Sequence, residues 1–288
     1  MSKLLLCDGH NLAFRAFYGI RELSRSDGMP TNMIHGWLKT FWRLEDELSP
    51  DSIYVFFDKG GCPRRQAILP SYKANRGAPP EGFSEQLEWV KKLSLAIGYQ
   101  CFEESGAEAD DLIASALSQS RQLFEQILIV SSDKDLAQLV SDGVSQLLPP
   151  PTANPRIGWR QLDHNGVKEK FGVSPTKILD YLAIIGDQSD NIPGINGVGP
   201  KTAVKWLSEF GNLDDVILNA GRLSPKRFCS LVYENRDLLK RNQDLIRLDD
   251  KIHLEFGTSK VQWEELERIL NDLEMVKSLE EAKSRYVA

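Results

Sequence analysis

Nine acidic side chains lie where the chain is predicted to enter or leave an element of regular structure. They are Asp8, Asp58, Glu108, Asp110, Asp111, Asp133, Asp135, Asp187 and Asp190. Most follow a short apolar run, and the runs are far apart in the sequence. If folding gathers these anions, cations must lie among them to offset the repulsion. Carboxylate oxygens are the ligands that Mg²⁺ and Mn²⁺ prefer, so we expect a site for two or more such ions that hydrolyses a phosphodiester.

Apolar runs and helical periodicity alternate along the first half of the chain. The runs predict strands at 3–8, 52–57, 99–102, 127–132 and 144–148, and the periodic segments predict helices at 31–48, 84–97, 107–120 and 134–140. Such alternation is typical of an α/β fold with a mainly parallel central sheet flanked by helices. The carboxyl ends of parallel strands meet at one edge, where ligands bind. That edge would bring Asp8, Asp58 and Asp133 together.

A proline-rich segment, PPPTANP at 149–155, interrupts the alternation, and the patterns after it are mostly helical. We therefore predict a catalytic α/β core at 1–155, a helical subdomain at 156–255 and a strand and helix segment at 256–288 that packs on the core. Within the last segment, residues 264–286 predict one charged helix on the protein surface.

Composition argues against several classes of protein. The 288 residues include 41% hydrophobic and 26% charged side chains, as in ordinary globular proteins. No apolar stretch is long enough to span a bilayer, and Asp8 interrupts the short apolar run near the N-terminus, so neither a membrane protein nor a signal peptide is predicted. The four cysteines form no CxxC pair, which argues against zinc and disulfides and favours a cytoplasmic location.

The net charge of −6 at pH 7 is unusual for a protein that binds nucleic acid. This objection weakens if the nine carboxylates belong to a metal site, because the remaining charge is slightly basic. The four histidines share no ligand spacing, and they support no Ser-His-Asp or Cys-His arrangement. Only His10 is near the predicted chemistry, and we assign it no role.

Each carboxylate has a structural explanation when it is considered alone. Asp8 could end a strand in a turn, and Asp133 could cap the next helix. This explanation is weaker for the whole set, because closely spaced acids recur at 108–111, 133–135 and 187–190. Two ions about 3.5–4 Å apart need many carboxylates, some of which act through bound water.

A glycine-rich turn between two helical patterns occupies residues 178–211 and predicts a helix-hairpin-helix. Gly197 and Gly199 would let backbone N–H groups approach a phosphate, and Lys201 and Lys205 would add positive charge. The sequence does not match a P-loop, because a proline separates the last glycine from the lysine. An ordinary helical corner is the alternative.

The segment at 59–83 is long, weakly periodic and rich in glycine, proline and basic residues, so we expect a functional or mobile loop. Its basic set is Lys59, Arg64, Arg65, Lys73 and Arg76, with Tyr72 beside Lys73. Arginine and lysine neutralise backbone phosphates, and a tyrosine can stack on a base. Arg15, shortly after the first strand, could meet the same substrate. The alternative is a solvated loop without this role.

With these residues in place, the chain resembles the 5′-nuclease family, which includes flap endonucleases and the 5′→3′ exonuclease domain of bacterial DNA polymerase I. The resemblance covers about residues 3–250 and depends on LLLCDGHNLAFRAFYG, VFFDKGG, EADD, SSDKDLAQLV and GDQSDNIPGINGVGPKTA. It implies a PIN-like sheet, a helical arch at about 59–83 and a helical subdomain with a helix-hairpin-helix (H3TH). No polymerase domain follows in the sequence, so we expect a standalone nuclease.

The resemblance also implies roles for individual residues. All nine carboxylates would hold divalent ions, Lys73 and Arg65 would be catalytic, and K⁺ would bind at the hairpin. Contacts with DNA are expected from Arg15, Tyr72, Arg76, Gly197, Gly199, Lys201, Thr202 and Lys205.

These roles predict a structure-specific 5′ nuclease, with 5′→3′ exonuclease and 5′-flap endonuclease activity and a two-metal-ion mechanism that uses Mg²⁺ or Mn²⁺. The expected substrates are DNA or RNA–DNA with 5′ flaps, nicks or free 5′ ends, in replication and repair such as Okazaki-fragment processing. We expect a cytoplasmic monomer that works with a separate DNA polymerase and ligase. Two alternatives are a catalytically silent relative that binds branched DNA and a PIN-like RNase.

Overall fold

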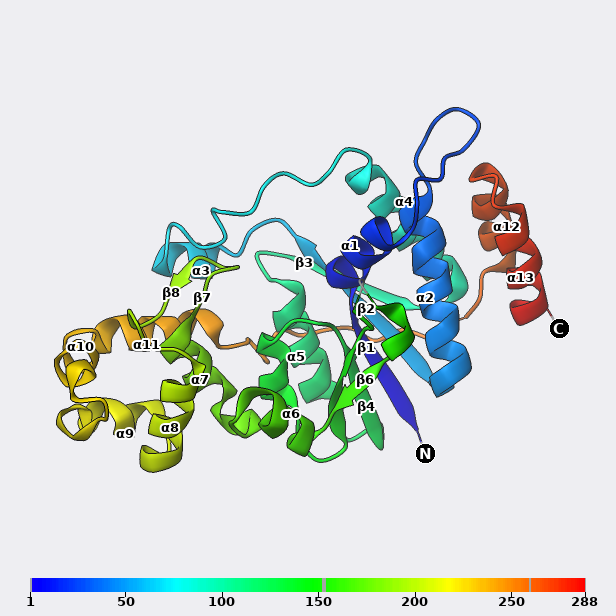
Figure 1. Ribbon diagram of the computed structural model, residues 1–288. Coiled ribbons are helices and arrows are strands. Elements are labelled where there is room, and N and C mark those ends of the chain that lie inside the picture. The colour runs from blue at the N-terminus through cyan, green and yellow to red at the C-terminus, as the bar shows by residue number, and fades with distance from the viewer. Residues whose placement is uncertain (1, 152–153, 259, 288) are drawn as a thin grey trace.

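The computed structural model describes residues 2–151, 154–258 and 260–287, which form an α/β sheet joined to a helical subdomain (Figure 1). The central sheet has the strand order β3–β2–β1–β4–β5–β6. The strands are β1 (Lys3–Asp8), β2 (Ser52–Lys59), β3 (Gln100–Ser105), β4 (Gln126–Val130), β5 (Val144–Leu148) and β6 (Arg160–Leu162). Every neighbouring pair is parallel except β5 with β6. The predicted mainly parallel sheet is therefore confirmed, with an unpredicted antiparallel strand at one edge.

Helices cover both faces of the sheet, which explains why β1 is apolar and buried at every position from Leu4 to Cys7. The helices are α1 (Gly9–Gly19), α2 (Asn32–Leu48), α4 (Phe83–Ile97) and α5 (Ala109–Ser120). Leu5 and Cys7 of β1 belong to the apolar cluster that contains α2 and α4, whereas Leu4 and Leu6 belong to the cluster that contains α5. The predicted helix at 134–140 is a 3₁₀ turn, Asp135–Leu139.

Strand β1 lies where the order of the sheet reverses, because β2 pairs with one side of it and β4 with the other. A reversal of this kind leaves a crevice at the carboxyl ends of the strands. Asp8 ends β1, Asp58 is the second-last residue of β2, and Asp133 follows β4. The topology therefore gathers these three carboxylates at one edge, as the sequence predicted.

The helical subdomain has its own apolar core, which includes Trp206 and Leu239. Its helices are α6 (His164–Phe171), α7 (Ile178–Ile185), α8 (Pro200–Phe210), α9 (Leu213–Leu218), α10 (Cys229–Glu234) and α11 (Arg236–Ile246). Between α7 and α8, the short strands β7 (Gly186–Asp187) and β8 (Ile192–Pro193) pair. Glycine is required at Gly186, because its φ is +75° and a Cβ would lie 2.3 Å from the backbone nitrogen of Gly194.

Residues 59–83, predicted as a loop or arch, contain the short helix α3 (Pro63–Ile68) and then a turn before α4. This arch segment runs above the sheet to the helical subdomain (Figure 1). Tyr72 packs in the apolar core of that subdomain, together with Ile68 and Leu69. The backbone N–H of Lys73 donates to the carbonyl of Asp190 at 3.0 Å. The arch segment is therefore attached to the hairpin between α7 and α8.

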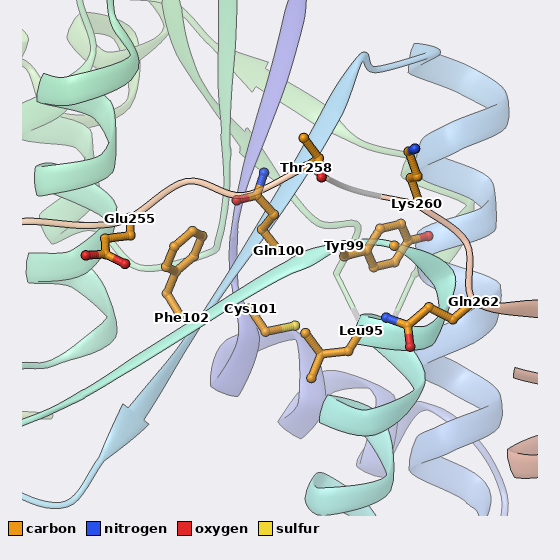
Figure 2. A pocket seen from close by; sticks show the side chains of 10 residues that line it. Leu95, Tyr99, Gln100, Cys101, Phe102, Glu255, Thr258, Lys260 and Gln262 are labelled. Atoms are coloured by element: carbon orange, nitrogen blue, oxygen red, sulfur yellow. The ribbon is translucent and has the colours of Figure 1, made fainter. Parts of the chain in front are cut away.

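The C-terminal part crosses the edge strand β3 and ends in the helices α12 (Trp263–Asp272) and α13 (Val276–Tyr286). The side-chain amide of Gln100 exchanges hydrogen bonds with the backbone of Gly257 at 2.9 and 2.8 Å. A cavity of about 230 Å³ lies under this crossing, between Phe102 and Glu255 on one side and Tyr99 on the other (Figure 2).

Two details of this part differ from the predictions. The single helix expected at 264–286 is wrong, because the chain turns at Glu274, which has a φ of +56°. The expected strand is not present in the described residues after 255. Within the described residues, no helix has the length and apolar character that crossing a membrane requires.

Candidate metal centre

A pocket of about 260 Å³ lies at the carboxyl edge of the sheet. Its lining contains five of the nine predicted carboxylates together with two cations: Asp8, Asp58, Glu108, Asp110 and Asp133, with Lys73 and Arg76, and also His10, Asn11, Phe14 and Ala109. We call it the carboxylate pocket. Elements distant in the sequence therefore supply one concave and strongly charged site.

Asp8 links the end of β1 to the start of α1. Its carboxylate accepts a hydrogen bond from the backbone N–H of Asn11 at 3.0 Å and another from the Ser131 hydroxyl at 2.9 Å. Burial, together with the charges of Asp58 and Asp133, raises the pKa of Asp8 to about 7, although these hydrogen bonds lower it. Asp8 therefore ends β1, as the sequence suggested, and also caps α1, which was not predicted. It remains a desolvated acid that a cation would stabilise.

Asp58 is oriented by α5 and by a histidine that the sequence analysis left without a role. Its Oδ1 accepts from the backbone N–H of Ala109 at 2.7 Å. The backbone N–H of Asp58 donates to Nδ1 of His10 at 3.0 Å. Because Nδ1 accepts a hydrogen bond, the His10 ring is neutral, in agreement with a pKa that burial lowers. The position of His10 two residues after Asp8 was the signal for this role.

A second group of carboxylates lies beside the pocket and consists of Asp135, Asp187 and Asp190, with one oxygen of each within 4.8 Å of the others. We call it the Asp135 cluster. Burial raises the pKa of Asp135 well above its ordinary value, and the neighbouring acids add to this. Oδ1 of Asp135 is buried and has no hydrogen-bond partner among the described residues. An all-oxygen donor set with an unsatisfied carboxylate oxygen fits Mg²⁺ or Mn²⁺.

Two side chains already offset part of the charge of the Asp135 cluster. Nζ of Lys134 lies 2.9 Å from Asp187, and Nη2 of Arg76 donates to Asp190 at 2.6 Å. Burial alone would raise the pKa of Asp187, but its hydrogen bonds to Ser189 and Lys134 lower it. The sequence analysis missed Lys134, although its place between two predicted ligands was a signal.

The third acidic group contains Glu108, Asp111 and Cys62, and Arg65 fills the space between them. We call these four residues the Arg65 cluster. Nη1 of Arg65 donates to Glu108 at 2.5 Å and to Asp111 at 2.7 Å, and Nη2 donates to Asp111 at 2.8 Å. Asp111 also accepts from the backbone N–H of Asp249 at 2.8 Å. The cation of this cluster is therefore a guanidinium, and Asp111 does not line the carboxylate pocket.

Glu108 belongs to both the Arg65 cluster and the carboxylate pocket. Its Oε1 accepts from Nζ of Lys73 at 2.6 Å, while Oε2 accepts from Arg65. Burial opposes ionisation of Glu108, but these two cations outweigh it and lower the pKa. Burial likewise opposes the charge on Lys73, and the acids around it, led by Glu108, raise its pKa. Glu108 and Lys73 are thus a charged pair at the wall of the pocket.

The predicted contacts of Arg65 and Tyr72 with a substrate do not agree with the structure, because both side chains are buried. Arg65 is only 1% exposed and its donors are directed to protein groups, so it does not contact a substrate in this conformation. Tyr72 is 6% exposed, and its hydroxyl lies 2.9 Å from Glu108 and 3.2 Å from Asp190. The ring of Tyr72 therefore cannot stack on a base, because it packs inside the helical subdomain.

The other predicted DNA contacts are spread over the molecule. Arg15 donates to the carbonyl of Pro150 and lines a groove with Lys39 and Arg43, outside the carboxylate pocket. The turn and the first residues of α8 carry Gly197, Gly199, Lys201, Thr202 and Lys205, and both lysines are exposed. None of these residues lines the carboxylate pocket. Of the predicted DNA contacts, only Arg76 lies there.

The fold and the site together define a class: a resolvase-like α/β domain, with acids at the carboxyl edge of its sheet, followed by a SAM-like helical domain. Residues 3–172 match the 5′-3′ exonuclease N-terminal resolvase-like domain, and residues 173–269 match the 5′-3′ exonuclease C-terminal SAM fold. The chain therefore belongs to the 5′-3′ exonuclease family.

Curated relatives of this chain include bacterial DNA polymerases. DNA polymerase I of Rhizobium leguminosarum is 35% identical over 260 residues, which are 88% of this chain and 25% of the relative. DNA polymerase I of Mycobacterium tuberculosis is 35% identical over 286 residues, 94% of this chain and 30% of the relative. The thermostable DNA polymerase I of Thermus thermophilus is 33% identical over 254 residues, which are 88% of this chain and 29% of the relative. The chain thus spans between a quarter and a third of these relatives.

Solved structures support the same fold. The bacteriophage T5 flap endonuclease, in a complex with DNA and metal ions, has a TM-score of 0.73 at 24% identity and covers 97% of this chain and 98% of its own. The T5 5′-exonuclease with bound zinc has a TM-score of 0.72 at 25% identity and covers 95% of this chain and 98% of its own. The catalytic core of Rad2 with a DNA substrate has a TM-score of 0.62 at 14% identity and covers 94% of this chain and 87% of its own.

Proposed function

We propose that this chain is a structure-specific 5′ nuclease that acts as a 5′→3′ exonuclease and 5′-flap endonuclease in DNA replication and repair. The observation that carries the proposal is the carboxylate pocket, in which desolvated acids adjoin Lys73 and Arg76. The DNA and metal complexes of the similar T5 and Rad2 proteins support this choice of substrate.

Divalent ions, Mg²⁺ or Mn²⁺, would be held by eight of the predicted ligands. These are Asp8, Asp58, Glu108, Asp110 and Asp133 of the pocket, and Asp135, Asp187 and Asp190 of the adjoining cluster. When bound, such ions activate water and neutralise charge on a phosphate. We leave Asp111 out of this set, because its oxygens already accept from Arg65 and Asp249.

The side chains of the pocket would orient the substrate and stabilise charge. Lys73 and Arg76 would bind the oxygens of the scissile phosphate, where negative charge develops during cleavage. The neutral ring of His10 would keep Asp58 in place through its backbone N–H. A product with a 5′-phosphate and a 3′-hydroxyl would then be available to a DNA polymerase and a ligase.

Recognition of the duplex would depend on shape and not on bases. The turn with Gly197 and Gly199 presents backbone groups at the start of α8, and Lys201 and Lys205 lie exposed on that helix. We propose that this hairpin binds duplex phosphates, with a K⁺ ion held by backbone carbonyls, and that a free 5′ end reaches the pocket below the arch segment.

A cleavage gel tests this proposal. End-labelled 5′-flap DNA and unstructured RNA are incubated separately with the full chain and Mg²⁺, with chelated controls and the Asp133→Asn variant as the matched inactive protein. We expect wild-type protein to cut the flap, to cut RNA poorly and to require the divalent ion, whereas Asp133→Asn binds the flap without cutting it. Preferential cleavage of RNA would instead support a PIN-like RNase, and binding without cleavage by wild-type protein would support a silent relative.

A further inference from the structure

Arg65 lies where three segments of the chain meet: the arch segment, the start of α5 and the C-terminal end of α11 with the residue that follows it. From α3 it reaches Glu108 and Asp111 at the start of α5. Its Nε donates to the carbonyl of Leu245 at 2.8 Å, and its Nη2 lies 3.4 Å from the carbonyl of Arg247. A guanidinium has five N–H donors in a rigid plane, so one side chain can hold all three segments at once.

Asp111 completes this junction from the side of α5. Its carboxylate binds Arg65 through both oxygens and accepts from the backbone N–H of Asp249. One turn along α5, the Ser115 hydroxyl donates to the carbonyl of Asp249 at 2.9 Å and accepts from the backbone N–H of Ile252 at 3.1 Å. The chain that leaves the helical subdomain is therefore fixed to the helix that carries Glu108 and Asp110.

The junction meets the carboxylate pocket at two acids of its lining, and Asp110 is the more distant, with its Oδ1 3.7 Å from Nη1 of Arg65. Glu108 is the only residue of the described lining that also contacts Arg65 at hydrogen-bond distance. One of its oxygens is held by Arg65 and the other by Lys73. One carboxylate oxygen of Glu108 lies within 4.8 Å of one of Asp111. Without the guanidinium these two buried anions would repel each other, and Glu108 would rotate out of place.

We infer that Arg65 is a positioning residue, with Asp111 as its anchor, that fixes Glu108 for divalent-ion binding and couples that binding to the docking of the helical subdomain on α5. This inference rests on the proposed function of the carboxylate pocket. It replaces both sequence-based roles, since Arg65 acts through Glu108 and Asp111 acts through Arg65. Groups that orient metal ligands in this way affect ion affinity by about 10–100-fold.

The test compares Arg65→Met, Arg65→Lys and Asp111→Asn with a matched control, Arg285→Met. Arg285 joins α13 to α2 through two hydrogen bonds of 2.7 Å to Asp46. Neither residue lines the carboxylate pocket. Loss of Arg285 removes an ion pair between segments without a change near Glu108. Each variant is the full chain, and its melting temperature is measured first to show that it folds.

Two readouts follow the divalent ion. The first is direct binding of Mn²⁺, measured by electron paramagnetic resonance without DNA. The second is the Mg²⁺ concentration that gives half-maximal single-turnover cleavage of 5′-flap DNA. We expect Arg65→Met to weaken Mn²⁺ binding and raise the half-maximal Mg²⁺ concentration by about tenfold or more, with a KM for DNA within about threefold of wild type. Arg65→Lys should recover part of the loss, and Asp111→Asn should show a smaller effect of the same kind.

Other outcomes would overturn the inference. If Arg65→Met lowers the melting temperature as Arg285→Met does but leaves Mn²⁺ binding unchanged, Arg65 is only a structural ion pair. If it raises the KM for DNA and spares ion binding, Arg65 contacts the substrate. If Arg65→Met does not fold, the same comparison is made with Asp111→Asn, and unchanged Mn²⁺ binding in that variant contradicts the inference. Failure of wild-type protein to cut any flap would reject the proposed function alone, because the Mn²⁺ measurement does not require cleavage.

Discussion

The Arg65 cluster and the Asp135 cluster are both groups of buried acids, but their charges are balanced in different ways. In the first, a buried guanidinium lies between the acids and donates to Glu108 and Asp111. In the second, Lys134 pairs with Asp187 and Arg76 pairs with Asp190, both from outside the group. A buried oxygen of Asp135 has no hydrogen-bond partner among the described residues. A group of acids therefore indicates a metal site only where the chain does not itself place a cation between them.

The difference has a physical basis in the shape of the cations. A planar guanidinium binds a carboxylate through two parallel N–H donors, so it can occupy the middle of an acidic group and satisfy it. Lys134 and Arg76 are both partly exposed and approach from the surface. They lower the local charge without filling the space between the carboxylates. A small divalent ion can fill that space and bind several oxygens at once.

Replacement of one acid in each cluster by asparagine should have opposite effects on the metal-free protein. Asp135→Asn should raise the melting temperature without metal, because it removes an acid whose pKa burial raises. It should also reduce cleavage of flap DNA by at least about a hundredfold. Asp111→Asn should lower the stability by about 3–5 kcal/mol, because it breaks a buried ion pair and leaves Arg65 with less compensation.

Differential scanning fluorimetry without metal, together with single-turnover cleavage, checks both variants. Asparagine keeps the volume of aspartate, so a change in packing does not confuse the comparison. If both substitutions lower the melting temperature by similar amounts, the proposed distinction between the two clusters is wrong.

The next largest effect is expected at Lys73, one of the two cations that line the carboxylate pocket. Lys73→Ala should lower the single-turnover rate by about a hundredfold, because the stabilisation of charge on the scissile phosphate is lost. Affinity for flap DNA should change by only a few fold, since many other phosphate contacts remain. Rapid-quench kinetics and a binding titration in Ca²⁺ separate the two quantities. An equal loss in both would make Lys73 a residue that positions the substrate.

The sequence was sufficient to predict the five parallel strands of the sheet and most of the pocket, because both follow from the apolar runs and the residues at their ends. It could not separate Asp110 from Asp111. Adjacent residues on a helix point about 100° apart, so Asp110 lines the pocket whereas Asp111 faces Arg65, and only the packed orientation of α5 decides which is which. Tyr72 was misplaced for a similar reason, because burial of the arch segment on the helical subdomain depends on contacts between distant residues.

A smaller effect, on stability, is expected from pH. The folded-state pKa of Asp8, about 7, lies above its ordinary value of 3.8, so the folded protein binds this proton more tightly than the unfolded chain does. The resulting stability is fully present below about pH 4 and is lost as the pH rises to about 7. Burial raises the pKa of Asp110 and Asp133 in the same direction.

The melting temperature of the metal-free protein should therefore fall between pH 5 and pH 8, and Mg²⁺ should restore it more at pH 8 than at pH 5. The first part reports the burial of the acids and, to a smaller extent, the repulsion among them, and the second reports the ion that offsets both. In Asp8→Asn the dependence on pH should be weaker. A melting temperature that is independent of Mg²⁺ at pH 8 would contradict the assignment of these acids to a metal site.

The smallest predicted effect is at Tyr72, whose hydroxyl lies between Glu108 of the Arg65 cluster and Asp190 of the Asp135 cluster. Tyr72→Phe keeps the buried ring and removes only this link, so cleavage should slow by about three- to tenfold, which corresponds to the net energy of one ordinary hydrogen bond. The matched control is Tyr99→Phe, which removes a buried hydrogen bond of 2.6 Å to Glu45 on α2. If both variants lose stability but only Tyr72→Phe loses rate, the hydroxyl connects the two clusters in function. Equal cleavage rates in both variants would show that the Arg65 cluster and the Asp135 cluster act independently.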